Sequence, residues 1–126
     1  MSVPDGPMSL KEFWPYYLGE HRSAANRWLH VVGSLGGLVW LGLAIYTRNP
    51  WLVLAGLVNG YAFAWIGHFF IEKNKPATFQ HPGKSFLCDW IMMAKTLTFT
   101  IGADLAQLEA PTSQDSSAPN EAPLKV

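Results

Sequence analysis

Apolar and polar positions divide this chain into two long uncharged segments with polar segments around them. The first runs from 31 to 46, and the second starts at 51 and ends in a polar segment that opens with Glu72. A helix of about 20 apolar residues matches a bilayer core of about 30 Å. The first segment has only 16 residues, but Trp28, Leu29 and the aliphatic stem of Arg27 can lengthen it. The pattern predicts two transmembrane helices.

The turn between these segments predicts how they pack. Only residues 47–50 separate them, and helices joined by so short a turn are antiparallel neighbours. Each segment also carries a G-x-x-x-G pattern, formed by Gly33 with Gly37 and by Gly56 with Gly60. Because small residues let helices approach closely in lipid, we expect the glycines to hold the hairpin together.

A short helix is predicted before the hairpin. Ser9 and Glu12 form an S-x-x-E capping box, and aromatic residues follow at helical spacing, although Pro15 limits how regular the helix can be. Trp and Tyr rings favour the headgroup region of a bilayer. We therefore expect an N-terminal interfacial helix, with packing into a core as the alternative.

A third apolar segment is predicted after the hairpin, from Phe86 to Ile101. Lys95 would lie near the middle of the bilayer if this segment crossed it, which is costly. The segment is therefore expected either to span while packed against the hairpin or to lie partly in the interface. Its apolar stripe is formed by Phe86, Trp90, Met93, Leu97 and Ile101.

Composition supports a small membrane protein with a single domain. Charged residues make up 14% of the chain and hydrophobic residues 49%, whereas soluble domains average about 25% charged residues. The stretch from Ala110 onward is rich in Pro, Ser and Ala and cannot support a core. We predict an all-α, multi-pass helical bundle over residues 1–109 and a disordered tail over residues 110–126.

The charges predict which partners the chain has and how it is oriented. Because the net charge is zero, nucleic-acid binding is discounted. The single cysteine, Cys88, allows no internal disulfide, which excludes a disulfide scaffold. By the positive-inside rule, the ends of the hairpin outside its turn are cytoplasmic, in a bacterial inner membrane or in the endoplasmic reticulum. Six basic residues flank those ends, against Arg48 in the turn: Lys11, Arg22, Arg27, Lys73, Lys75 and Lys84.

This topology brings all four histidines, His21, His30, His68 and His81, to one membrane face. In one continuous helix His21 and His30 would lie on opposite sides, but an N-cap at Ser23 places His21 in a loop and removes this objection. Neutral imidazoles suit Zn, Fe, Cu or Ni, and the spacing alone does not choose between these metals. A shared metal or cofactor site is predicted at this face.

Two carboxylates lie near the predicted site. Glu72 is an i, i+4 partner of His68, and would be either a ligand or an acceptor that fixes the imidazole tautomer. Asp89 lies one turn into the third segment, near the histidine face. Both are candidate catalytic residues.

Two long motifs resemble a known family. They are E-H-R-S-A-A-N-R-W-L-H-V-V-G at 20–33 and G-H-F-F-I-E-K-N-K-P-A-T-F-Q-H-P-G-K-S at 67–85. Both are similar to the paired motifs of the Mpo1-like family, also called domain of unknown function 962, and the resemblance covers about residues 9 to 100. Its yeast member is a membrane protein of the endoplasmic reticulum, an iron(II)-dependent dioxygenase that shortens 2-hydroxy fatty acids by one carbon. The resemblance implies this activity here, with Fe²⁺ held by the four histidines.

Four imidazoles on a six-coordinate iron would leave too few positions for both a chelating 2-hydroxy acid and O2. We therefore expect either three histidine ligands with the fourth histidine outside them, or a ligand that leaves when substrate binds. The acyl chain is expected to extend into the bilayer between the helices. Arg22 or Arg27 is expected to pair with the substrate carboxylate. Polar residues of the same motifs complete the set of candidate substrate-binding residues: Asn26, Asn74 and Lys75.

Two alternatives remain open at this point. One is a non-enzymatic membrane protein that binds lipid or assists assembly, with histidines that satisfy one another. The other is haem binding by an axial pair such as His30 and His68. The sequence does not predict the oligomeric state.

Overall fold

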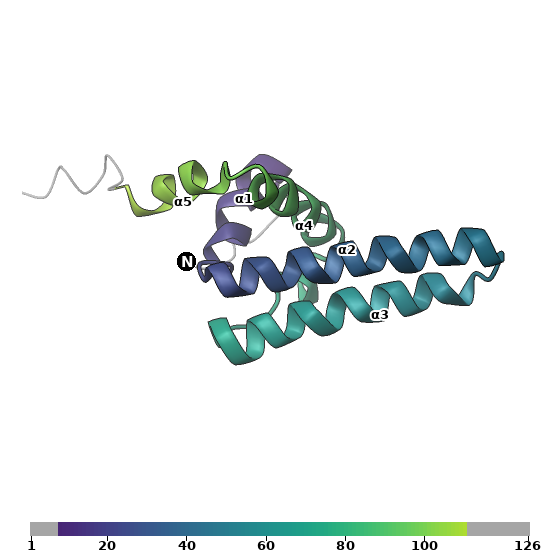
Figure 1. Ribbon diagram of the computed structural model, residues 1–126. Helices are drawn as coiled ribbons and strands as arrows, with labels where there is room; N and C mark the ends of the chain where they lie inside the picture. The colour runs from purple at the N-terminus through teal and green to yellow at the C-terminus, as the bar shows by residue number, and fades with distance from the viewer. Residues whose placement is uncertain (1–7, 111–126) are drawn as a thin grey trace, which may run out of the picture.

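The computed structural model describes residues 8–110, and this part of the chain is all-helical (Figure 1). The all-α prediction is confirmed. The predicted tail lies outside the described residues, apart from Ala110 itself. The elements are α1 (Leu10–Gly19), α2 (Ala24–Thr47), α3 (Trp51–Ile66), a π-helix η1 (Gly67–Glu72), a 3-10 turn η2 (Ala77–Phe79), α4 (Pro82–Leu97) and α5 (Ile101–Glu109).

Helices α2 and α3 form the predicted antiparallel hairpin and lie side by side along their length (Figure 1). A Cβ atom added at Gly33 would lie 2.9 Å from the Cβ of Phe63 and 3.2 Å from the carbonyl oxygen of Gly60. A Cβ added at Gly56 would lie 3.2 Å from the carbonyl oxygen of Gly37. The two backbones therefore approach so closely that glycine is needed at these positions, as the sequence predicts.

Two helices of the described chain are long and apolar enough to cross a membrane, namely Ala24–Thr47 and Trp51–Glu72. Only 22% of the most apolar stretch of each is buried within the protein. The core helix of a soluble protein would be mostly buried. Instead, the hairpin presents large apolar side chains outward, and Val39, Ile45 and Val58 are all more than half exposed.

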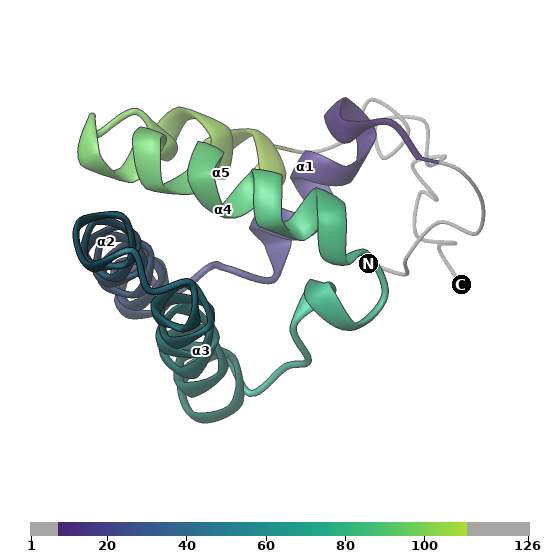
Figure 2. The same ribbon diagram turned by 90° about the vertical axis from the view of Figure 1, so that its right-hand side faces the viewer.

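The remaining helices, α1, α4 and α5, gather around the end of the hairpin where α2 begins and α3 ends (Figure 1). We call these three helices the cap. Figure 2, which views the hairpin nearly end-on, shows that α4 and α5 run across it. Unlike the hairpin, the cap has a conventional buried core, whose members include Phe13, Tyr17, Leu18, Cys88, Met92 and Ile101.

The third apolar segment differs from the prediction. Helix α4 ends at Leu97, Phe99 adopts a positive φ of 58°, and a separate helix α5 begins at Ile101. Lys95 forms an ion pair with Asp104 of α5, with a distance of 2.7 Å between Nζ and Oδ2. With its 16 residues α4 is not one of the candidate spans. The charge of Lys95, which would make it costly for this segment to cross a bilayer, is paired with a carboxylate within the cap.

The buried face of α4 also differs from the predicted stripe. Its buried residues are Ser85, Cys88, Met92 and Thr96, whereas Phe86 and Leu97 of the predicted stripe are nearly half exposed. The amphipathic spacing was compatible with more than one face. Helix α4 packs mainly against α2 and η2 and also contacts α1 and α5, and this packing buries the face with the smaller side chains.

Candidate metal centre

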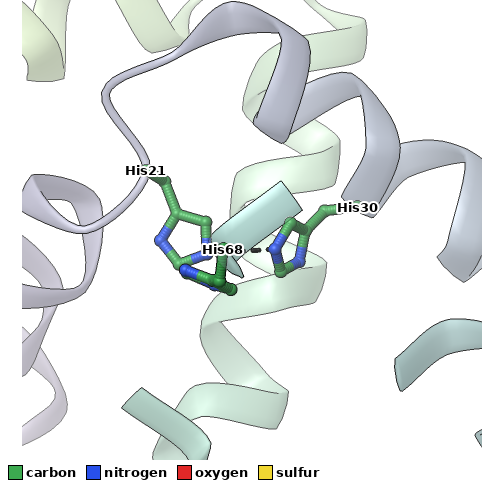
Figure 3. Close-up of side chains that lie close together, drawn as sticks. All are labelled: His21, His30 and His68. Carbon is green, nitrogen blue, oxygen red and sulfur yellow. Dashed lines mark hydrogen bonds between the residues drawn. The ribbon is translucent and has the colours of Figure 1, made fainter. Parts of the chain in front are cut away.

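Three of the four histidines converge where the cap meets the hairpin (Figure 3). His21 lies in the loop between α1 and α2, His30 lies two turns into α2, and His68 lies at the start of η1. Their exposed fractions are 1%, 6% and 2%. One ring nitrogen of each lies within 4.8 Å of the others, and the Nε2 atoms of His21 and His30 are 3.2 Å apart.

The loop that carries His21 is fixed by the first turns of α2. Ser23 occupies the N-cap position, as predicted, although its side chain makes no capping hydrogen bond. The guanidinium of Arg27 donates hydrogen bonds to the carbonyl oxygens of His21 and Arg22, at 2.9 and 2.7 Å. The imidazole of His21 stacks on the ring of Tyr17, with 4.1 Å between the centroids. Arg27 therefore holds the backbone of His21 while Tyr17 orients its ring.

His68 is placed by an irregular end to the second long helix. The chain changes from α- to π-helix at Gly67, and Lys73 ends it with a left-handed φ of 56°. The backbone N–H of Asn74 then donates to the carbonyl oxygen of His68, which returns the Asn74 side chain to the imidazole. Single π-turns of this kind are frequent at functional sites.

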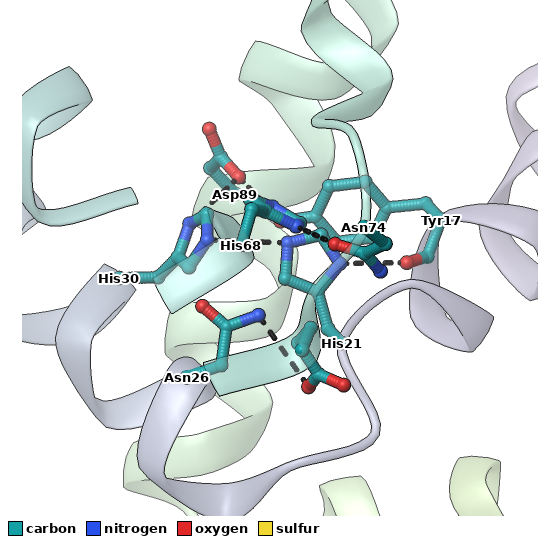
Figure 4. Close-up of polar contacts among 8 residues, drawn as sticks. Tyr17, His21, Asn26, His30, His68, Asn74 and Asp89 are labelled. Carbon is teal, nitrogen blue, oxygen red and sulfur yellow. Dashed lines mark hydrogen bonds and ion pairs between the residues drawn. The ribbon is translucent and has the colours of Figure 1, made fainter. Parts of the chain in front are cut away.

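Each of the three imidazoles has an acceptor for its Nδ1 nitrogen outside the cluster (Figure 4). His21 Nδ1 lies 2.7 Å from the carbonyl oxygen of Tyr17, and His68 Nδ1 lies 2.7 Å from Oδ1 of Asn74. His30 Nδ1 lies 3.3 Å from Oδ1 of Asp89. If every Nδ1 donates its proton outward, every Nε2 carries a lone pair directed into the cluster, which is the tautomer that metal-ligating histidines adopt.

The electrostatics of the site agree with this arrangement. Burial lowers the pKa of His21 well below its usual value, and the neighbouring His30 and His68 lower it further, so this imidazole is neutral at pH 7. Burial, together with the carboxylate of Asp89, raises the pKa of Tyr17, so its hydroxyl stays protonated and donates to Asp89. With every Nδ1 proton directed outward, the Nε2 lone pairs of the three imidazoles would face one another without a donor, and a bound cation would satisfy them. The residues present therefore fit a transition-metal ion such as Fe, Zn or Cu.

The fourth histidine does not join the cluster. His81 occupies the N-cap position of α4, and its ring lies against Phe13 with 5.3 Å between the centroids. Its backbone is fixed by hydrogen bonds to Ala77 and from Ser85. The geometry thus departs from a four-histidine ligand set and corresponds to the alternative with three ligands.

Glu72 contacts the start of α2 and not the imidazole of His68. Its carboxylate accepts hydrogen bonds from the backbone N–H of Ser23 at 2.5 Å and from Nδ2 of Asn26 at 3.5 Å. A π-helix pairs residue i with i+5, so the i, i+4 spacing expected of an α-helix no longer aligns Glu72 with His68. The acceptor that fixes the tautomer of His68 is Asn74, which the sequence suggested only as a substrate-binding residue.

The five residues predicted to bind substrate have other environments. Arg22 and Lys75 are exposed, and Arg27 is engaged by backbone carbonyl oxygens. Asn26 is fully buried beneath Gly67, where an added Cβ would lie 1.8 Å from its Oδ1 atom. Asn74 donates to the backbone and carboxylate of Glu20, at 3.0 and 2.6 Å. These contacts position the loops around the histidines.

A cavity of about 250 Å³ opens beside the three histidines. Asp89, a candidate catalytic residue, lines this cavity, whereas the five candidate substrate-binding residues do not. Several polar residues of this lining were not predicted as site residues, among them Tyr17 and Ser85. Tyr17 lies four residues before His21, and this helical spacing was the available signal for their contact.

Comparison with protein families gives an independent result. Residues 8–101 match a family model described as "2-hydroxy-palmitic acid dioxygenase Mpo1-like". Neither the comparison with curated proteins nor that with solved structures gave a match. The matched range contains all four histidines and extends from α1 to the first residue of α5. The chain therefore belongs to the Mpo1-like family.

Proposed function

We propose that this protein is an iron(II)-dependent membrane dioxygenase that shortens 2-hydroxy fatty acids by one carbon. The observation that carries the proposal is the cluster of three buried histidines, each with an outward acceptor for Nδ1, beside an apolar cavity. Three protein ligands leave coordination positions open, as catalytic metal sites require. The description of the family model supplies the substrate class.

The proposed overall reaction balances with O2 as the only co-substrate. The bond between C1 and C2 of the acid breaks, C1 leaves as carbon dioxide, and C2 becomes the carboxyl carbon of the shorter acid. O2 accepts four electrons and contributes to the new carboxyl group, and one water forms. Bound iron(II) would supply the redox chemistry that lets O2 react with a closed-shell acid.

The protein's own side chains have distinct roles in this proposal. His21, His30 and His68 would hold the ion. The Asp89 carboxylate lines the cavity and is well placed to accept the proton of the substrate's 2-hydroxyl group. Tyr17 donates a hydrogen bond to Asp89 and would keep that carboxylate oriented toward His30. The apolar walls would exclude water from the reacting head of the substrate.

We further propose that the hairpin spans the bilayer, with the cap and the histidines at the cytoplasmic face. The mostly exposed apolar surface of both long helices supports insertion, and the basic residues at the cap end support the orientation. Arg48→Cys, in the turn, should react with an impermeant thiol reagent added outside intact bacterial cells that express the protein. Labelling of that position only after cell lysis would contradict the orientation.

The activity is tested with purified protein in detergent. The protein is loaded with iron(II) without oxygen and then given a 2-hydroxy fatty acid and O2, and the products are identified by mass spectrometry. We expect one iron per chain, no Soret band, and an acid one carbon shorter than the substrate. Bound iron without turnover would overturn the dioxygenase proposal.

The alternatives predict different results from the same sample. A Soret band would favour haem, and a protein that binds no metal would favour a lipid-binding or assembly role. The contacts make haem the weaker alternative, because His21 lies 4.6 Å from His30 and 4.5 Å from His68 between ring centroids. A porphyrin between His30 and His68 would have to displace that third ring.

A further inference from the structure

The cavity beside the histidines extends along one face of each long helix. On α2 its lining positions follow the helical repeat from His30 to Leu41, and on the second long helix they run from His68 in η1 back to Val53 in α3. The hairpin is antiparallel, so both sets start at the histidines and end near the same level. The floor of the cavity includes closely packed glycines of both helices: Gly33, Gly37, Gly56 and Gly60. The cavity is therefore an elongated groove with the metal centre at one end.

The two ends of this groove differ in polarity. The histidine end holds His21, Tyr17, Asp89 and Ser85, whereas the far end is lined by aliphatic side chains, among them Leu41 and Val53. Leu41 and Val53 are 43% and 41% exposed. Helix α4 covers only the histidine end, because its last lining residue is Trp90. The far half of the groove is thus open along its side, toward the lipid in the proposed topology.

The hydroxyl of Ser85 is the clearest sign that the polar end binds a ligand. Ser85 is 1% exposed, lines the groove, and its Oγ atom has no hydrogen-bond partner within the described chain. It lies one helical turn before Asp89, on the same face of α4. A buried hydroxyl without a partner costs free energy, and a polar group bound in the groove would satisfy it.

We propose that this groove is the acyl-chain subsite of the enzyme and that Leu41 and Val53 set the length of chain it accepts. The proposal rests on the proposed function, because that function fixes the head of the substrate at the histidines. Leu41 lies eleven positions after His30, which corresponds to a rise of about 16 Å at 1.5 Å per residue. An extended chain advances about 1.25 Å per carbon with standard bond lengths and angles, so the groove accommodates about 13 carbons beyond the head.

The same arrangement gives Ser85 a specific role as a positioning residue. Its hydroxyl donates a hydrogen bond to the carboxylate or hydroxyl oxygen of the bound acid, one turn from the Asp89 carboxylate. The head of the acid is thereby held at the metal centre while the chain lies against the glycine floor. The chain enters sideways from the bilayer, so no lid has to open.

The length prediction is tested by changing the far end of the groove. Leu41→Trp should shorten the accepted chain and weaken binding of the longest acids that the wild type binds by about tenfold or more, because a pocket discriminates steeply against a chain that no longer fits. Leu41→Ala should extend the accepted length. The control is Leu43→Trp, because Leu43 lies on the same helix with the same 43% exposure but does not line the groove.

Two readouts keep this test separate from the test of the dioxygenase activity. One is equilibrium binding of saturated 2-hydroxy acids of increasing length to the iron-loaded protein without oxygen, and the other is turnover of the same acids. A length preference that moves in the Leu41 variants but not in Leu43→Trp supports the groove, even if no acid is turned over. Turnover with an unchanged length preference in both Leu41 variants overturns the groove and leaves the dioxygenase intact. Val53→Trp, checked for full iron content, provides a second blocking variant.

Ser85→Ala tests the polar end. It should weaken binding by about tenfold for acids of every length, as expected for loss of a hydrogen bond to a charged group, and leave the length preference unchanged. Removing a hydroxyl that has no partner should not lower the protein's thermal stability. Unchanged affinity in Ser85→Ala would overturn the role given to this side chain.

Discussion

The cap and the hairpin are both rich in apolar residues, yet they place them in opposite environments. Phe13 in the cap is fully buried, whereas Phe70 near the end of η1 is 76% exposed. The cap is held by side-chain packing around its core, and the hairpin by contact between glycine backbones. Hydrophobicity alone therefore does not distinguish the two regions, whereas the arrangement of small residues does, because glycines at four-residue spacing allow the close helix contact of the hairpin.

The metal centre joins the two regions, and removing a ligand should have the largest effect of any single change. His21 comes from the loop next to the cap, and His30 and His68 come from the hairpin. Each of His21→Ala, His30→Ala and His68→Ala should lower iron affinity by more than about 100-fold, beyond what loss of an outer hydrogen-bond partner costs. Iron content after dialysis measures this effect.

His81→Ala is the matched control for these variants, because its ring packs against Phe13 outside the cluster. It should keep one iron per chain. If His81→Ala loses iron as completely as His68→Ala does, the three-histidine site is wrong and a fourth ligand joins when metal binds.

The second prediction concerns the core of the cap. Phe13→Ala should destabilise the cap by about 3–5 kcal/mol, since it leaves a cavity in a closely packed core. Phe70→Ala should have little effect. Cys88 provides a local probe, because it is fully buried and burial raises the pKa of its thiol to about 12.

At about pH 8 the folded cap should therefore protect Cys88 from alkylation, since the thiolate is the reactive form. Phe13→Ala should accelerate labelling by about 100-fold or more, the factor that corresponds to the lost stability. Phe70→Ala should label at the wild-type rate. Equal labelling of the two variants would mean that the cap is not an independent packed unit.

The sequence predicted those features that depend on local pattern. The hairpin, the capping box at Ser9 and Glu12 and the glycine contacts all follow from periodicity and short spacing. The position of His21 in a loop followed from Ser23 as an N-cap. These signals involve residues a few positions apart, so one chain is enough to detect them.

Features that depend on backbone irregularity or long-range packing were not predicted. The π-helix at Gly67–Glu72 places Asn74, and not Glu72, beside His68. The residue propensities of G-H-F-F-I-E do not predict a π-helix. The placement of His81 against Phe13 depends on how α4 packs across α1. The break between α4 and α5 depends on the positive φ of Phe99 and the Lys95–Asp104 ion pair, which only the folded cap defines.

The third prediction tests whether α4 helps to orient a hairpin histidine. Asp89→Asn removes the charge that His30 Nδ1 contacts at 3.3 Å, and an amide can present its N–H₂ group to that nitrogen, which favours the wrong tautomer. Iron affinity should fall by about 10- to 100-fold. The control is Asp104→Asn, which removes a cap carboxylate paired with Lys95 on the other side of α4 and should leave iron affinity unchanged. Equal iron affinity in Asp89→Asn and the wild type would exclude Asp89 as the partner of His30.

The smallest effect is expected from the glycine contact that holds the hairpin. Gly33→Ala places a methyl group 2.9 Å from the Cβ of Phe63 and 3.2 Å from a backbone oxygen, so the helices must separate, at a cost of about 1–3 kcal/mol. Gly42→Ala is the control, because nothing lies within 4 Å of its added Cβ, and it should be neutral or slightly stabilising. Unfolding in mixed detergent measures both. His30 lies one turn before Gly33, and His68 lies at the end of the opposite helix. Gly33→Ala should therefore also weaken iron binding, because it changes the distance between these two histidines. A change in the cap that leaves the hairpin closed should not alter that distance. Iron affinity that is unaffected by Gly33→Ala would show that the cap alone determines the geometry of the site.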